Sequence, residues 1–188
     1  YAPEKATDLS RFIESRKGLV YEAHSTDFQP RERLRELVRD HFAILKVGPA
    51  LTYALREGLF ALASAADEMI PTERRSHLRE VIGRVMLDEP GYWQKYYPGS
   101  FSEQSLLRIY SQSDRIRYYW PHPAVSAATD RLFANLSSEK LPVGLVRQYA
   151  GLERARLGDG AVTAKSIVLD KIWQVLDDYR FGCYGQLN

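Results

Sequence analysis

Two short apolar segments, each followed by a helix that begins at a proline, constrain the fold most strongly. Residues 19–24 and 42–47 have the length and composition of buried strands, and Pro30 and Pro49 open the helices that follow them. Successive strand, loop and helix units are typical of α/β proteins, in which right-handed crossovers join parallel strands. Two strands alone make no stable sheet, so we expect further strands to complete it.

The pattern changes after Pro71, because every later segment has the apolar spacing of a helix and no strand pattern returns. We predict helices that start near His77, Ser100, Pro123 and Pro142, and a last helix over residues 164–179. The sequence therefore predicts two parts, residues 1–70 with the strands and residues 71–188 with helices only.

Composition excludes several classes of protein. The 188 residues carry 26 Lys and Arg against 24 Asp and Glu, a net charge of +2 that argues against nucleic acid as a main partner. Cys183 is the only cysteine, so no internal disulfide can form, and we expect a reducing, cytoplasmic location. Arg56 and Glu57 interrupt the most apolar stretch, which excludes a membrane span there. The first residue is not Met, and we expect a longer parent chain.

Three candidate site residues lie near the ends of the two strands. Alternation places Glu22 and His24 on one face of the first strand, and Lys46 lies near the end of the second. His24 is a candidate metal ligand, with Glu22 binding the metal or orienting the ring. A hydrogen-bonded structural histidine and an ion pair between Glu22 and Lys46 are the alternatives.

Gly48 and Pro49 begin a helix directly after a strand. The free amides of such a helix can bind phosphate, as the loops after the last strands of βα barrels often do. The same pair is also ordinary for the start of a helix, and the sequence has no richer glycine run here.

Two segments, residues 91–99 and 113–123, mix tyrosine and tryptophan with basic residues. Such a mixture can stack nucleic-acid bases, but it is also the composition of protein interfaces. The near-neutral total charge favours the protein interface.

Longer strings resemble a known family. VYEAHSTD from Val20, HFAILKVGPALTYALREGLFAL from His41, YWQKYYPG from Tyr92, SDRIRYYWPHPAV from Ser113 and LDDY from Leu176 are similar to the GatZ/KbaZ family of tagatose bisphosphate aldolase accessory subunits, across the whole chain. Family members are much longer, so the resemblance implies the C-terminal half of such a protein. Its two strands would be the last two of a TIM (β/α)8 barrel, followed by a helical extension.

The resemblance also implies a function. The family supports a separate class II aldolase subunit, which carries the zinc and cleaves tagatose bisphosphate during galactitol or amino-sugar breakdown. His24 matches a zinc-binding histidine of catalytic relatives, whereas Ser25, Thr26 and Asp27 replace their glycine-rich phosphate loop, and Gly48 replaces a substrate-binding asparagine. Side chains in the loop would obstruct a backbone cradle for phosphate.

We therefore expect a non-catalytic partner of a class II aldolase, which could also form a homo-oligomer. The alternative is a zinc-dependent aldolase in which His24 binds zinc with ligands from outside this chain, Glu22 or Lys46 assists, and Ser25 and Gly48 bind substrate phosphate. A sugar-phosphate kinase is a weaker alternative, because these residues hold no Walker-type loop.

Overall fold

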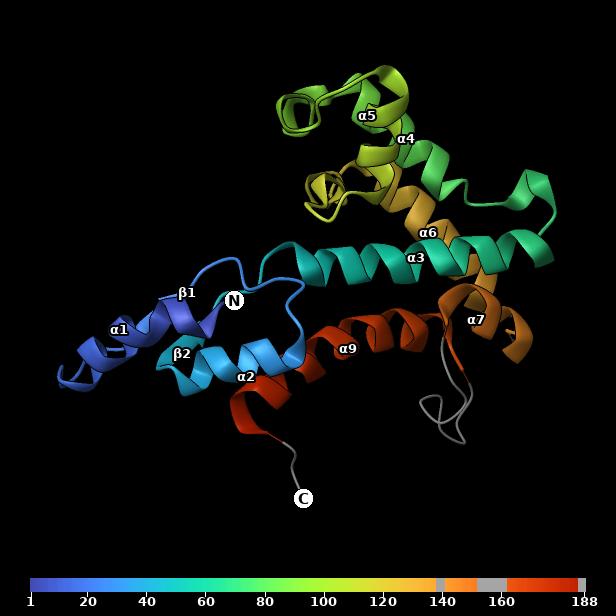
Figure 1. The fold of residues 1–188 in the computed structure, drawn as a ribbon. Coiled ribbons are helices and arrows are strands. Elements are labelled where there is room, and N and C mark those ends of the chain that lie inside the picture. Colours follow the sequence, from blue (N-terminus) through green and yellow to red (C-terminus); the bar gives the residue numbers. More distant parts are fainter. Residues whose placement is uncertain (138–140, 152–161, 186–188) are drawn as a thin grey trace. The chain divides into compact units, whose positions relative to one another are not determined.

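The computed structural model describes residues 1–137, 141–151 and 162–185, and they form two compact units (Figure 1). Unit 1 comprises Tyr1–Leu51 and Trp173–Asn188, and unit 2 comprises Thr52–Ile172. Helices α3 (Pro49–Met69) and α9 (Ala164–Tyr184) each belong to both units.

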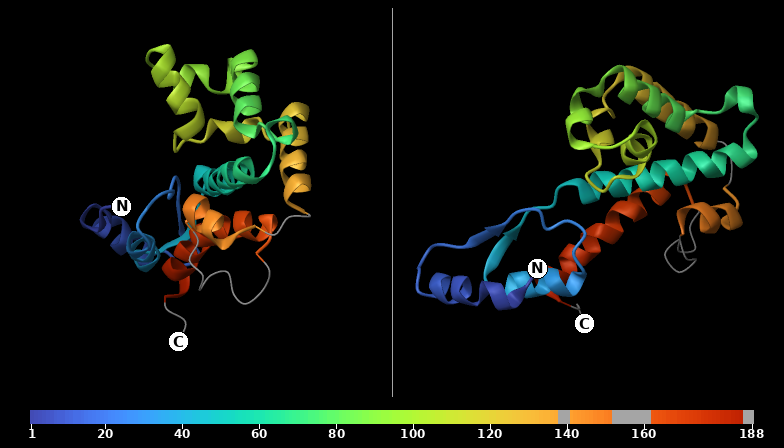
Figure 2. Two further views of the ribbon diagram at one scale, coloured as in Figure 1. Left: turned by 90° about the vertical axis from the view of Figure 1, so that its right-hand side faces the viewer. Right: turned by 45° about the horizontal axis from the view of Figure 1, so that its top comes forward.

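Unit 1 contains a two-stranded parallel sheet of β1 (Tyr21–Ala23) and β2 (Phe42–Leu45), which run side by side in Figure 2. Helix α1 (Pro3–Glu14) precedes β1, and α2 (Arg31–Arg39) makes the crossover between the strands. The pairs Glu22 with Ile44 and Ala23 with Leu45 set the register, and an irregularity follows Tyr21. Parallel strands need such a crossover because a tight turn cannot join them.

The core of unit 1 is small. Ala23 of β1 packs with Leu34 and Leu37, which share one face of α2 because they lie three residues apart. The final turns of α9 complete this core where Gly182 meets α2. A Cβ on Gly182 would lie 2.8 Å from the Leu34 Cβ, so this close approach requires glycine.

Unit 2 is helical in its described residues and has a much larger core. Helix α3 packs with α4 (Leu78–Asp88), α5 (Phe101–Tyr110), α6 (Pro123–Ser137), α7 (Val143–Ala150) and the first turns of α9. Short 3-10 turns at Thr72–Arg74, Pro90–Tyr92, Gln94–Tyr96 and Arg115–Tyr118 connect them. The most deeply buried apolar side chains of this core are those of Leu62, Leu78, Ile82, Met86, Ile116, Tyr119, Val125, Leu132, Val146 and Ile167.

Helices α3 and α9 approach closely within unit 2. A Cβ on Gly58 would lie 3.0 Å from the Val168 Cα, and such a backbone contact has little room to yield. Glycine at this position therefore permits the contact between the two helices.

The structure confirms a predominantly helical α/β chain with a small parallel sheet. Both strands are shorter than predicted. The first ends at Ala23 because Ser25 adopts a left-handed φ of 54°, which an extended strand cannot contain. Past β2 the described residues contain no strand, as predicted, and α9 continues five residues beyond the expected end.

Closure into a barrel and the boundary at residue 70 stay predictions for the longer protein. None of the helices within the described ranges is long and apolar enough to cross a membrane.

Candidate functional site

The ends of β1 and β2 bring together three residues that the sequence singled out. Glu22 Oε1 lies 2.6 Å from His24 Nε2 and 3.4 Å from Lys46 Nζ. All three side chains are exposed, with relative exposures of 40% for Glu22, 67% for His24 and 51% for Lys46. One carboxylate thus bridges an imidazole and an ammonium group at the surface of unit 1, an arrangement that is worth little for stability.

The start of α3 is capped by a side chain from the β1–α2 loop. Asp27 Oδ1 accepts hydrogen bonds from the amides of Gly48, at 2.8 Å, and Ala50, at 2.9 Å. A Cβ on Gly48 would lie only 3.2 Å from Asp27 Oδ2. A carboxylate of the chain itself therefore occupies the amides that would otherwise bind an anion.

A buried threonine fixes this loop. Thr26 Oγ1 donates to the Lys46 carbonyl oxygen at 2.9 Å and lies 2.8 Å from the hydroxyl of Tyr179 on α9. Burial raises the pKa of the Tyr179 hydroxyl, and the negative charge of Asp27 acts in the same direction. Thr26 and Asp27 thus have defined bonding roles, whereas neighbouring Ser25 is exposed in a left-handed conformation.

The sequence predicts that residues 25–27 obstruct a backbone cradle for phosphate or, in the aldolase alternative, that Ser25 binds the substrate phosphate. It does not predict the cap by Asp27. Asp27 lies 21 positions before Gly48, so no local pattern around the Gly-Pro helix start points to this cap.

Glu22 and His24 are the two side chains here that could hold a metal. Across the described ranges, no three His, Cys, Asp or Glu side chains cluster closely enough to bind a metal ion. Further ligands for a zinc ion would have to come from outside these residues, since metal sites in proteins use three or four.

Unit 2 carries a second candidate, an aromatic–arginine surface formed by Tyr92, Tyr96, Arg115, Arg117 and Tyr118. The Arg115 guanidinium lies 3.4 Å from the Tyr96 ring centroid, and the Arg117 guanidinium lies 4.8 Å from that of Tyr118. The rings of Tyr92 and Tyr118 stack at 5.0 Å. The three tyrosines are 41–51% exposed, so cations and rings are held in order at the surface.

Buried groups support this surface from below. Trp93 and Tyr97 pack their rings 6.3 Å apart in the core, and the Tyr97 hydroxyl accepts a hydrogen bond from the Arg115 amide at 3.2 Å. Lys95 and Arg115 lower the pKa of Tyr96, chiefly through the hydrogen bond from Lys95. This part of the chain is therefore preorganised and positively charged.

A family model described as D-tagatose-1,6-bisphosphate aldolase subunit GatZ/KbaZ-like matches residues 1–184. The D-tagatose-1,6-bisphosphate aldolase subunit GatZ of Klebsiella pneumoniae is 54% identical over 99% of this chain, and that of Salmonella dublin is 51% identical over 97%. Each is matched over 44% of its own length, so this chain spans less than half of these relatives.

A solved structure is also similar. The crystal structure of a probable tagatose 6 phosphate kinase from Sinorhizobium meliloti superposes on this chain with a TM-score of 0.93, and the two sequences are 47% identical. The match covers 97% of this chain and 48% of the chain in that crystal structure. Similarity at this level, together with the family match over nearly every residue, shows that the chain belongs to the GatZ/KbaZ-like family of D-tagatose-1,6-bisphosphate aldolase subunits.

Proposed function

We propose that the protein containing this chain is an accessory subunit that binds a catalytic class II tagatose bisphosphate aldolase and supports its activity and stability. Family membership supplies the reaction, because relatives at 51–54% identity are named as subunits of D-tagatose-1,6-bisphosphate aldolase. The geometry at the strand ends favours a supporting role over an independent active site.

The bonding of Asp27 carries this proposal. Its carboxylate accepts hydrogen bonds from the Gly48 and Ala50 amides, where a barrel enzyme that binds a sugar phosphate would offer free amides. A phosphate at this position would meet a negative charge and would have to displace it. Gly48 also provides no side chain with which to hold a substrate.

Unit 1 supports a barrel in the longer protein. Val20 is 61% exposed directly before β1, and Ile44 is 47% exposed within β2. More than half of the relatives' length lies outside this chain. We propose that strands from that part pair with β1 and β2 and bury these side chains, which closes the sheet.

The aromatic–arginine surface is our proposed contact with the catalytic subunit. Exposed tyrosines beside arginines are the side chains most enriched at the centres of protein interfaces. The side chains of Arg115 and Arg117 stack on Tyr96 and Tyr118, respectively. Because these side chains are already ordered, they lose little conformational entropy when a partner binds.

Complex formation tests this function. Full-length protein is mixed with the catalytic aldolase subunit, and light scattering gives the mass of the complex and of each free subunit, including any homo-oligomer. We expect a mixed complex whose dissociation constant rises at least about tenfold in the double variant Tyr96→Ala, Arg115→Ala. Arg131→Ala, at an exposed position of α6 outside the surface, is the control.

No complex with the wild-type protein would contradict the accessory role. A complex with unchanged affinity in the double variant would leave that role standing and would contradict the proposed contact surface.

The short contact between Glu22 and His24 favours a second candidate, a zinc-dependent aldolase. A carboxylate bonded to one ring nitrogen is the usual way to orient a metal-binding histidine. Bound zinc would polarise the substrate carbonyl. This candidate predicts about one zinc per full-length chain by elemental analysis and loss of that zinc in His24→Ala. Full-length protein that binds no zinc excludes it.

A further inference from the structure

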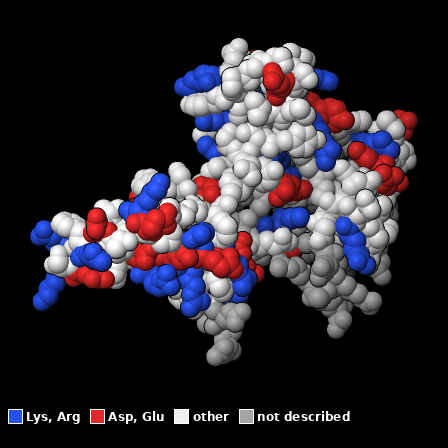
Figure 3. Space-filling view, in the orientation of Figure 1, with Lys and Arg blue, Asp and Glu red and all other residues white. Residues whose placement is uncertain are grey.

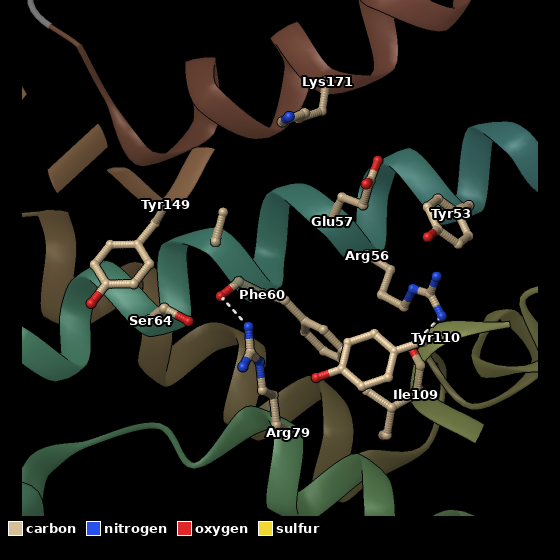
Figure 4. A pocket seen from close by; sticks show the side chains of 11 residues that line it. Tyr53, Arg56, Glu57, Phe60, Ser64, Arg79, Ile109, Tyr110, Tyr149 and Lys171 are labelled. Carbon is tan, nitrogen blue, oxygen red and sulfur yellow. Dashed lines mark hydrogen bonds between the residues drawn. The ribbon is translucent and has the colours of Figure 1, made fainter. Parts of the chain in front are cut away.

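A cavity of about 230 Å³ lies over one face of α3 within unit 2 (Figure 4). Its floor is formed by side chains three and four residues apart along α3, and its walls come from α4, α5, α7 and α9. The lining residues are Tyr53, Arg56, Glu57, Phe60, Ala61, Ser64, Arg79, Ile109, Tyr110, Tyr149 and Lys171.

Two arginines of this cavity are held in place by carbonyl oxygens and aromatic rings. Arg79 Nη2 donates to the Phe60 carbonyl oxygen at 3.2 Å, and its guanidinium lies 4.9 Å from the Phe60 ring centroid. Arg56 donates to the Ile109 carbonyl oxygen and lies 4.0 Å from the Tyr53 ring centroid. Figure 4 shows both bonds. Neither contact neutralises the positive charge.

The charges of the lining are unbalanced. Arg56 is buried and has an acidic neighbour, Asp114, at 3.5 Å. Arg79 and Lys171 form no ion pair with any other residue in the described ranges, and Glu57 is the single carboxylate among the lining residues. Arg79 and Lys171 therefore present two uncompensated positive charges from α4 and α9, on either side of α3 (Figure 4).

We propose that this cavity binds a small phosphorylated polyol. Guanidinium and ammonium groups are the usual partners of a phosphate, and Arg79 is already oriented for it. The hydroxyls of Ser64 and Tyr110 provide hydrogen-bonding groups, and the rings of Phe60 and Tyr110 provide apolar surface for the carbon chain. The volume is below the range of about 300–1,000 Å³ of most ligand cavities, so the ligand is small. This site does not depend on the proposed accessory role.

Isothermal titration calorimetry on the full-length protein tests the site, with glycerol 3-phosphate, inorganic phosphate and glycerol as separate probes. We expect glycerol 3-phosphate to bind more tightly than phosphate, glycerol to give no saturable heat, and affinity to fall as salt is raised. Equal affinity for glycerol 3-phosphate and phosphate would overturn the polyol part of the proposal. Absence of saturable binding by either phosphate probe would overturn the whole.

Variants locate the binding. Arg79→Ala and Lys171→Ala should each raise the dissociation constant at least about tenfold, because each removes a charged contact. Glu57→Gln should lower it, since the substitution removes the carboxylate of the lining. Arg84→Ala on α4 and Lys165→Ala on α9 change exposed cations that do not line the cavity, and they should leave it unchanged. Equal binding by wild type, Arg79→Ala and Lys171→Ala would place the ligand elsewhere and overturn the assignment.

Discussion

Unit 1 and unit 2 differ most in how much apolar surface each buries by itself. Unit 2 encloses a continuous core from α3 to the first turns of α9, whereas the core of unit 1 consists of Ala23, Leu34 and Leu37 with a few half-buried neighbours. Unit 1 leaves Leu19, Val20 and Ile44 exposed around its two strands. The comparison shows that unit 2 is close to self-sufficient, while unit 1 has the surface of an incomplete sheet.

The charged side chains follow the same division. On the face drawn in Figure 3, acidic and basic side chains are densely intermixed over the helices of unit 1, while unit 2 shows broad uncharged areas. Helix α2 has five arginines and glutamates in its first six residues, and Leu34 is buried among them. This is the amphipathic pattern of a helix that covers the outside of a sheet.

The largest effect is expected in the core of unit 2. Leu132 is completely buried on α6, so Leu132→Ala should lower the free energy of unfolding by about 2–5 kcal/mol. Urea unfolding measures it. A change below about 1 kcal/mol would show that unit 2 is loosely packed and would remove the contrast with unit 1.

The next largest effect is a loss of stability on substituting Ile44, which should differ between this chain and the full-length protein. Ile44→Ser should change the stability of the 188-residue chain by less than about 0.5 kcal/mol, because Ile44 is exposed there. In the full-length protein the same change should cost at least about 1.5 kcal/mol if a neighbouring strand buries this side chain. Equal small effects in both would contradict barrel closure over β2.

Asp27→Ala tests the cap of α3. It removes the acceptor of the Gly48 and Ala50 amides and should cost about 1–2 kcal/mol of stability. If the carboxylate also excludes anions, the variant should bind inorganic phosphate more tightly than wild type in a calorimetric titration. Unchanged stability together with unchanged phosphate binding would refute both roles.

A pair of glycines sharpens the packing of unit 2. Gly83→Ala in α4 meets open space and should stabilise the chain by about 0.5–1 kcal/mol. Gly58→Ala in α3 places a Cβ 3.0 Å from the Val168 Cα. The steric clash should exceed the stability gained from the higher helix propensity of alanine, so this variant should be less stable than wild type. Thermal unfolding of both variants decides this, and stabilisation by Gly58→Ala would show that α3 and α9 are further apart.

The smallest effect concerns the start of α5. Hydrogen bonds from the amide and hydroxyl of Ser100 lower the pKa of Glu103. The folded protein therefore holds this carboxylate ionised more strongly than the unfolded chain. Its contribution is present above the unfolded pKa and is lost as pH falls through the lower folded pKa. Wild type should exceed Glu103→Gln in stability at pH 7 and lose that advantage at pH 3, which unfolding curves at both values measure.

Local patterns predicted much of this structure. The two strands, the crossover helix and the change to helices after Pro71 follow from periodicity and prolines. The helix predicted to start near Ser100 is α5, and a capping box of Ser100 and Glu103 begins it. Glu22, His24 and Lys46 meet because parallel strands bring their carboxyl ends together.

The remaining features depend on contacts between distant residues. Asp27 caps a helix 21 positions later, and the cavity over α3 joins Arg79 to Lys171 across more than ninety residues. No short pattern encodes such pairs. The left-handed conformation of Ser25 was also not predictable, because glycine and asparagine are the residues that usually indicate it and this position holds serine.

The most direct test of the account is the cleavage of tagatose bisphosphate by the full-length protein alone, by the catalytic class II subunit alone, and by the two together. We predict no cleavage by the full-length protein alone, and faster cleavage with slower thermal inactivation in the mixture than with the catalytic subunit alone. Metal-dependent cleavage by the full-length protein alone, abolished in His24→Ala, would contradict the accessory role and establish an active site at the strand ends.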